Sequence, residues 1–264
     1  MISYYLHQNH INRMNYWPTQ FFTSFLGSFW FGSLTVLYGL MVLVYNMELV
    51  YFDTIISKST VRYWMIRWNI FISSISGVGF LLVWRNFPGI VHVFNSECAT
   101  CEIAWVHGNR IDTYAVFIFM FLKPVEFLDT VFLILNGKPI SKLHWVHHIT
   151  VTLFCWHSAI YVNNAAGSMF ALMNYFVHAI MYGYYAIRSM GINPADYGLG
   201  NTVIPLTITV LQILQMIAGL LMMVQVALKC SWDVCNPINT LFGLGIYGTY
   251  FHMFVEYFFK RYLY

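Results

Sequence analysis

Three closely spaced histidines are the first group in this chain whose types and spacing could do chemistry. His144, His147 and His148 lie in the segment KLHWVHHITVT. Positions i, i+3 and i+4 share one face of an α-helix, so the spacing predicts that the three imidazoles stand together. Histidine changes its protonation readily near neutral pH, and an apolar run over residues 149–162 follows directly. We therefore expect a functional site at a membrane boundary.

The segment KPVEFLDT places three charged side chains inside another apolar run. Lys123, Glu126 and Asp129 interrupt this run, and Thr130 follows them. Charges within a bilayer are costly, so they usually face a cavity or pair with one another. Lys123 and Glu126 lie at i and i+3, which leaves a purely structural ion pair open as the alternative. Pro124 predicts a kink that turns backbone carbonyls inward.

Two later apolar segments carry polar stripes at helical spacing. The first stripe falls within a sector of roughly 100° at 3.6 residues per turn. It consists of Asn174, His178, Met181, Tyr182 and Tyr185. The second consists of Thr209, Gln212 and Gln215. A core histidine and glutamines that join helices are the structural alternatives. Because four consecutive segments each carry a stripe, we expect all four to face one water-accessible or ligand-filled cavity.

The apolar composition requires a membrane around these segments. The chain has 264 residues, of which 59% are apolar, 19% aromatic and 9% charged. A soluble protein could not cover its surface with so few charges, so we predict an all-α integral membrane protein. Apolar runs of about twenty residues indicate seven transmembrane helices. They cover residues 28–47, 68–84, 112–135, 145–162, 168–187, 203–227 and 238–259, within a single domain over residues 1–264.

The distribution of basic residues orients these seven helices. Eight basic residues fall on one side of the membrane and four on the other, with Lys123 inside it. Cytoplasmic loops carry the excess of lysine and arginine, so the C-terminus is expected in the cytosol and the N-terminus on the opposite side. The histidine triplet then opens to the cytosol. The net charge of +3 is small and scattered, which argues against a nucleic-acid partner.

The same orientation gathers four cysteines on the side away from the cytosol. Cys98 and Cys101 lie between the second and third helices, and Cys230 and Cys235 lie between the sixth and seventh. In an oxidising compartment a disulfide would join the two loops, with the pairing open. The fifth cysteine, Cys155, shares the helical face of the histidines. A thiol nucleophile with a histidine base is one interpretation, and an inert packed thiol is the one we favour.

Two other classes of function use similar residues. An HxxHH motif could bind iron or zinc, as in the histidine-box desaturases and hydroxylases of membrane lipids. Those enzymes carry three histidine boxes, whereas this chain has one complete box plus His178, and Lys123 disfavours a nearby cation. We therefore expect no metal. A seven-helix transporter would also suit the polar stripes, although it does not need a histidine triplet at the boundary.

Taken in order, these motifs resemble those of the very-long-chain fatty acid elongases, the ELO family. The matching motifs are KxxExxDT at 123–130, HxxHH at 144–148, NxxxHxxMYxYY at 174–185 and TxxQxxQ at 209–215. The resemblance is strongest from about residue 110 to 260. Trp145, which follows the first histidine, is similar to the saturated and monounsaturated fatty acid elongases in particular.

The resemblance implies a condensing enzyme of the endoplasmic-reticulum membrane, with its helices around an enclosed acyl-binding tunnel. The implied reaction joins a long-chain acyl-CoA, saturated or monounsaturated, to malonyl-CoA and yields 3-oxoacyl-CoA, carbon dioxide and CoA. No bound cofactor is implied. Candidate protein partners are the reductases and the dehydratase of the elongation cycle and a second copy of the chain.

The site residues follow from the matching motifs. We expect His147 to accept the acyl group and to face His178, while His144 and His148 orient it. Asn174 is expected to polarise a carbonyl or to stabilise the enolate left by decarboxylation. The residues expected to shape the site are Lys123, Glu126, Asp129, Thr130, Met181, Tyr182, Tyr185, Thr209, Gln212 and Gln215. Candidate CoA phosphate contacts, which could equally be ordinary positive-inside residues, are Lys138, Lys142, Arg188, Lys260 and Arg261.

Overall fold

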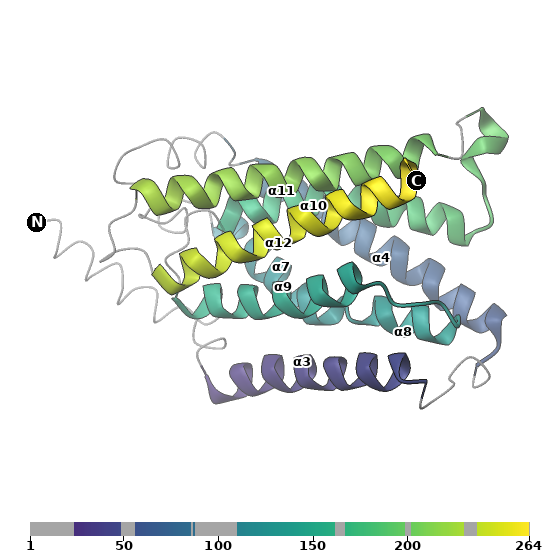
Figure 1. The fold of residues 1–264 in the computed structure, drawn as a ribbon, viewed down its shortest axis with the longest axis horizontal. Helices are drawn as coiled ribbons and strands as arrows, with labels where there is room; N and C mark the ends of the chain where they lie inside the picture. Colours follow the sequence, from purple (N-terminus) through teal and green to yellow (C-terminus); the bar gives the residue numbers. More distant parts are fainter. Residues whose placement is uncertain are drawn as a thin grey trace, which may run out of the picture.

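The structure, a computed structural model, describes residues 24–48, 56–85, 87, 110–161, 167–198, 202–229 and 237–263. Within these ranges the regular structure is helical throughout, which confirms the predicted all-α class (Figure 1). The four disulfide candidates lie outside the described residues; they are Cys98, Cys101, Cys230 and Cys235.

The helices follow the seven predicted spans. The first two are α3 (Phe25–Asn46) and α4 (Lys58–Trp84), and the third span is divided into α7 (Arg110–Val125) and α8 (Leu128–Leu135). The remaining spans are α9 (Lys142–Tyr161), α10 (Gly167–Ser189), α11 (Val203–Lys229) and α12 (Pro237–Tyr262), with a 3-10 turn, η1 (Pro194–Tyr197), before α11. The prediction of seven spans is confirmed if α7 and α8 are counted as one interrupted helix. The largest difference in a boundary is the start of α4, ten residues before the predicted one.

Three of these helices are long and apolar enough on their own to cross a membrane. They are Gly27–Asn46 of α3, the whole of α4 and Val203–Leu228 of α11. On α3, Val36 and Leu37 remain 62% and 61% exposed, as expected for side chains that face lipid rather than a protein core. The chain is therefore a multi-pass membrane protein.

The third span is interrupted where the sequence predicts a kink. Pro124 lies one residue before the end of α7, and α8 begins at Leu128. Across the gap the amide of Phe127 donates to the carbonyl of Pro124 at 3.3 Å, and the amide of Thr130 donates to that of Phe127 at 3.1 Å. These are the tighter bonds of a 3-10 turn, so the chain turns out of one helix and into the next without losing its backbone hydrogen bonds.

The two helices that carry histidine motifs stand inside the bundle. α9 packs against α3, α7 and α12, and α10 packs against α4, α7 and α11. Figure 1 shows α3 on one side of the molecule, next to α9. Lys58 at the start of α4 donates to the carbonyl of Leu135 at the end of α8, and Arg62 donates to the carbonyl of Ser189 at the end of α10. These bonds bring the start of α4 together with the ends of α8 and α10. Because Lys58, Arg62 and Arg188 lie there, we call this end of the bundle the basic end.

The opposite half of the bundle is filled by packed apolar side chains. Phe31, Ile72 and Tyr175 belong to one buried cluster there, and Met223 and Tyr247 belong to a second. Aromatic rings approach the backbone closely at glycines in this half. For example, a Cβ on Gly79 would lie 2.5 Å from the ring of Tyr175. The polar side chains of the same helices lie in the other half of the bundle, toward the basic end.

Candidate active site

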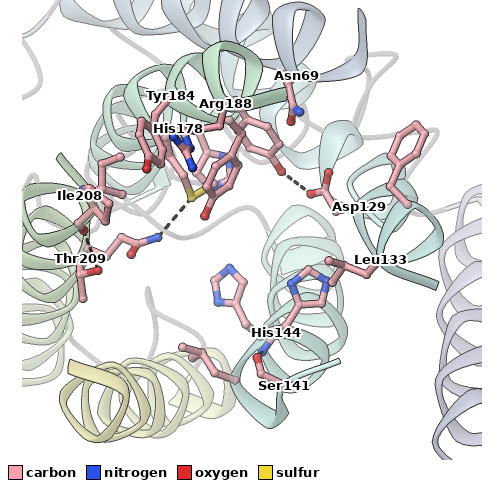
Figure 2. A pocket seen from close by; sticks show the side chains of 18 of the residues that line it. Asn69, Asp129, Leu133, Ser141, His144, His178, Tyr184, Arg188, Ile208 and Thr209 are labelled. Atoms are coloured by element: carbon pink, nitrogen blue, oxygen red, sulfur yellow. Dashed lines mark hydrogen bonds between the residues drawn. The ribbon is translucent and has the colours of Figure 1, made fainter. Parts of the chain in front are cut away.

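A cavity of about 720 Å³ lies between the helices in the half toward the basic end. The residues from the predicted polar stripes that line it are Glu126, Asp129, His144, His147, His148, His178, Met181, Tyr182, Tyr185, Thr209 and Gln212. Figure 2 shows His144 on α9 and His178 on α10 on opposite sides of the open space. All four polar stripes therefore contribute to the wall of one cavity.

The cavity reaches the molecular surface at the basic end. Lys138, Arg188 and Arg261 line it, and all three side chains are exposed. Lys142 and Lys260 are exposed as well, but they are not among the lining residues, and Lys260 is held in an ion pair on its own helix. Three of the five candidate phosphate contacts thus stand at the mouth of the cavity.

A buried ion pair lies behind the cavity wall. Lys123 and Glu126 each have 2% of their side chain exposed, and Nζ lies 2.6 Å from Oε1. The Lys123 ammonium also donates to Oδ1 of Asn174 at 3.2 Å and lies 4.5 Å from the centre of the Phe119 ring. Oε1 of Glu126 is 3.5 Å from Nδ1 of His178. Lys123 therefore has a structural role behind the wall, whereas Glu126 connects the ion pair to His178, which lines the cavity.

Some predicted site residues sit behind the wall rather than on it. Asn174 was expected to face the substrate, but it accepts its hydrogen bond from the buried ammonium and is absent from the residues that line the cavity. Thr130 is completely buried and lies between two groups, with its Oγ1 2.7 Å from Nε2 of His144 and 2.9 Å from the hydroxyl of Tyr38. Gln215 is 8% exposed and also lies outside the lining set.

Asp129 is held from two helices at once. Its Oδ1 accepts from the indole Nε1 of Trp68 on α4 at 2.6 Å, and its Oδ2 accepts from the hydroxyl of Tyr182 on α10. Figure 2 marks the hydrogen bond of Asp129 to α10 with a dashed line. All three residues line the cavity. The motif predicts Asp129 and Tyr182, but Trp68 has no polar neighbour at helical spacing to distinguish it from an ordinary boundary tryptophan.

The three motif histidines form a contiguous group on α9. The ring centre of His148 lies 4.4 Å from that of His144 and 5.7 Å from that of His147. In the described part of the chain, Nδ1 of His147 and Nδ1 of His148 are both buried without a hydrogen-bond partner. Tyr250 on α12 packs its ring 4.6 Å from the His147 ring and donates its hydroxyl to the His147 carbonyl at 3.3 Å. This contact could not be predicted from the sequence, because α12 carries no motif.

The alternatives for the histidine motif can be compared with this geometry. Among the described residues, no three histidine, cysteine, aspartate or glutamate side chains come together in a way that could hold a metal ion. Cys155 is 5% exposed and packs in an apolar cluster with Ala115 and Tyr175, outside the set that lines the cavity. Its packing fits the inert thiol that the sequence favours.

The whole described region matches a known protein family. The sequence fits the profile of the GNS1/SUR4 family, ELO, over residues 24–264. The chain belongs to the ELO family.

Individual ELO relatives align with much of the chain. It is 34% identical over 203 residues to the putative fatty acid elongase 3 of Caenorhabditis elegans, covering 74% of this chain and 60% of that protein. It is 32% identical over 207 residues to the very long chain fatty acid elongase 6 of Drosophila melanogaster, covering 75% and 62%. With the very long chain fatty acid elongase 3 of Mus musculus the identity is 31% over 244 residues, covering 90% and 85%. The chain thus spans about three fifths of the length of the first two relatives.

Proposed function

We propose that this ELO-family protein condenses a long-chain acyl-CoA with malonyl-CoA to form 3-oxoacyl-CoA, carbon dioxide and CoA. The observation that carries the proposal is a single cavity with His147 and His178 on its wall and Lys138, Arg188 and Arg261 at its mouth. The cationic mouth suits the phosphates of CoA, and the imidazoles lie farther inside, where the thioester would be placed. The family membership supports the same class of reaction.

The first half of the reaction transfers the acyl group to the protein. A neutral imidazole nitrogen of His147 attacks the thioester carbonyl, so a C–N bond forms and the C–S bond breaks. Nδ1 of His147 is buried, which leaves Nε2 as the nitrogen that a substrate can reach. CoA leaves as the thiolate and takes up the proton that the acylated imidazole loses, and we assign this proton transfer to His178, which also lines the cavity.

The second half builds the new carbon–carbon bond. Decarboxylation of malonyl-CoA breaks a C–C bond, releases carbon dioxide and leaves the enolate of acetyl-CoA. The enolate carbon attacks the acyl-imidazole and the C–N bond breaks. The imidazole of His147 takes up one proton from water as it leaves, which is the proton that the overall condensation consumes, and 3-oxoacyl-CoA is released. Because Asn174 is bonded to Lys123 behind the wall, we assign it to fixing the ammonium rather than to contact with the enolate.

The remaining parts of the proposal concern the setting of the enzyme. We place it in the endoplasmic-reticulum membrane as a single domain, with the basic end in the cytosol and the N-terminus in the lumen. Its acyl chains are saturated or monounsaturated, on the strength of Trp145 in the histidine motif. The reductases and dehydratase of the elongation cycle and a second copy of the chain are its proposed protein partners, and acyl-CoA and malonyl-CoA are its substrates.

Intact-mass measurement tests the covalent step. The purified protein incubated with acyl-CoA alone should gain the mass of one acyl group, and His147→Ala should not. His252→Ala is the matched control, because this histidine is exposed on α12 outside the cavity, and it should acylate like the parent. A parent protein that gains no acyl group, or an adduct that survives in His147→Ala, would refute the nucleophile assignment.

The overall reaction needs a separate measurement. Radiolabelled malonyl-CoA supplied with a panel of acyl-CoAs of different length and unsaturation should give labelled 3-oxoacyl-CoA from the saturated and monounsaturated members. Absence of labelled product from every member would refute the proposed condensation. Product from polyunsaturated substrates alone would refute the substrate assignment and leave the reaction standing.

A further inference from the structure

A chain of three hydrogen-bonding groups connects the outermost helix to the histidine triplet. The hydroxyl of Tyr38, on α3, lies 2.9 Å from Oγ1 of Thr130 on α8. The same Oγ1 lies 2.7 Å from Nε2 of His144 on α9. Tyr38 is 3% exposed and Thr130 is completely buried, so neither hydroxyl can turn to solvent. His144, by contrast, lines the cavity.

The burial of the two hydroxyl groups decides which group donates each hydrogen bond between Tyr38, Thr130 and His144. Each hydroxyl has one proton to give, and the described residues offer these two hydroxyls no other side-chain partner. If the His144 Nε2 carried a proton and donated it, one of the two hydroxyl protons would be left buried without an acceptor. A buried donor without a partner has lost its hydrogen bonds to water. The free-energy cost of that loss is larger than the net free energy that a hydrogen bond contributes to stability. Only one order uses both hydroxyl protons: Tyr38 donates to Thr130, and Thr130 donates to Nε2 of His144.

This order fixes the tautomer of His144. A neutral imidazole whose Nε2 accepts a hydrogen bond carries its proton on Nδ1. The nitrogen left for the cavity is therefore an N–H donor and not an acceptor. We propose that Thr130 is a positioning residue that, oriented by Tyr38, holds His144 as the Nδ1–H tautomer, whose N–H donates to the carbonyl oxygen of the bound acyl thioester.

The inference rests on the proposed function and adds a role that the motif alone does not supply. When an imidazole nitrogen of His147 bonds to the thioester carbon, the carbonyl oxygen gains negative charge. The Nδ1–H of His144 donates a hydrogen bond to that oxygen and keeps its proton throughout. When the C–S bond breaks, the carbonyl re-forms and the hydrogen bond weakens. A donor whose orientation is set before substrate arrives needs no rearrangement during the step.

Tyr38, which orients the Thr130 hydroxyl, is itself held rigidly. Its ring stacks on Phe127 with 4.1 Å between ring centres and an interplanar angle of 15°. Phe127 lies in the break between α7 and α8, so the stack fixes α3 against the segment that carries Thr130. The ring centre of Tyr38 is also 6.3 Å from that of His148. The hydroxyl is thus placed by packing that does not depend on its hydrogen bond.

The tautomer can be measured directly on the full chain without substrate. In protein labelled with 15N-histidine and held in lipid nanodiscs, the ring nitrogens of His144, assigned by their absence in His144→Gln, should show the proton on Nδ1. In Thr130→Val no hydroxyl donates to Nε2, and the signal should move toward the Nε2–H form. A proton on Nε2 in the parent, or a tautomer that Thr130→Val leaves unchanged, would overturn the inference.

Kinetics test whether the tautomer matters. Thr130→Val removes the donor to His144 and should lower the rate of acylation about ten- to a hundredfold, with KM for acyl-CoA changed less than about twofold, because the His144 N–H acts on charge that develops in the reaction. Thr130→Ser, which keeps the hydroxyl, should retain most of the rate. Tyr38→Phe keeps the stacked ring and the Thr130 donor, so it should keep the parent tautomer and lower the rate less than Thr130→Val does.

A matched variant separates positioning from folding. Tyr175→Phe also removes a buried phenol hydroxyl, one that donates to the carbonyl of Ala115 at 2.8 Å, and it lies outside the cavity. It should keep the parent rate and the parent tautomer of His144. Equal loss of rate in Thr130→Val and Tyr175→Phe would overturn the positioning role. If the parent protein has no condensing activity, the proposed function is refuted. The 15N spectra would still test the tautomer of His144 by themselves.

Discussion

Removal of one charge from the buried Lys123–Glu126 pair should destabilise the protein severely. The two side chains are each 2% exposed, and their charged atoms lie 2.6 Å apart. Glu126→Gln keeps the shape of the side chain but leaves the ammonium of Lys123 without a counter-charge. Its other neighbours are the Asn174 amide oxygen at 3.2 Å and the face of the Phe119 ring, and neither carries a formal charge.

The expected size of this effect follows from the burial of both partners. Loss of one member of a buried ion pair costs about 3 to 5 kcal/mol, because the remaining charge stays desolvated. For a chain of this length each kcal/mol moves Tm by about 2 to 4 °C, so Glu126→Gln should lower Tm by about 6 to 20 °C. Lys123→Met should destabilise to a similar degree. The double variant leaves no unpaired charge, so it should be more stable than either single variant.

The assay compares this buried ion pair with an exposed ion pair that has the same N–O distance. Thermal unfolding is followed by tryptophan fluorescence in nanodiscs for the parent, both single variants and the double variant. Lys260 and Glu256 on α12 also lie 2.6 Å apart, but their side chains are 72% and 49% exposed. Water screens such a pair, so Glu256→Gln should leave Tm within about 2 °C of the parent.

Two results would contradict this reasoning. If Glu126→Gln and Glu256→Gln both lower Tm by the same small amount, then burial does not increase the cost of removing the counter-charge of Lys123. Strict additivity in the double variant would mean that the two side chains act independently in spite of their 2.6 Å separation.

Three further perturbations test other parts of the structure. Trp68→Phe removes one of the two donors to Asp129 and should cost about 1 to 3 kcal/mol, seen as a lower Tm; an unchanged Tm would show that this indole bond does not hold the carboxylate. Gly219→Ala would push a methyl group into the ring of Tyr247 and should cost about 1 to 3 kcal/mol, whereas Gly245→Ala has no neighbour within 4 Å and should be neutral or slightly stabilising. Arg261→Gln at the mouth should raise KM for acyl-CoA and reduce the dependence of KM on salt, and a variant with the parent's salt dependence would remove Arg261 as a phosphate contact.

The wall of the cavity could be predicted from the sequence to the extent that it follows helical periodicity. His144, His147 and His148 share a face because i, i+3 and i+4 always do, and the spacing of His178 and Tyr182 works in the same way. In a chain this apolar, each such face must turn from lipid toward the interior. Local spacing therefore predicts which side chains of one helix act together.

The contacts between helices could not be predicted in this way. Tyr38 and Thr130 are separated by 92 positions in the chain. Tyr38 lies in an apolar helix without charged side chains, where nearby Thr35 donates only to the carbonyl of Phe31, so nothing marks a site. Asn174 shares the periodicity of His178, yet the structure turns it to a lysine behind the wall, because that ammonium needs more than one partner. Helical spacing fixes the face of a residue but not the neighbour that this face meets.

The start of α4 shows the same limit for element boundaries. Hydropathy predicts a helix from residue 68, but the helix begins at Lys58, where Ser57 caps it by accepting from the amide of Thr60 at 3.2 Å. The added turns include Lys58 and Arg62, which donate to the carbonyls at the ends of α8 and α10. Positive charge stabilises the C-terminal end of a helix, so these basic residues belong to the fold although they lower the hydropathy.

The break after Pro124 lets one short segment direct two carboxylates to different neighbours. In an unbroken helix Glu126 and Asp129 would lie at i and i+3, where like charges repel. Because α8 starts anew, Asp129 lies in its first turn, where the partial positive charge of a helix N-terminus favours a carboxylate. Glu126 stays in the gap beside His178 on α10, whereas Asp129 reaches Trp68 on α4. A helix interruption that lets each carboxylate fix a different neighbour gives the cavity its shape before any substrate enters.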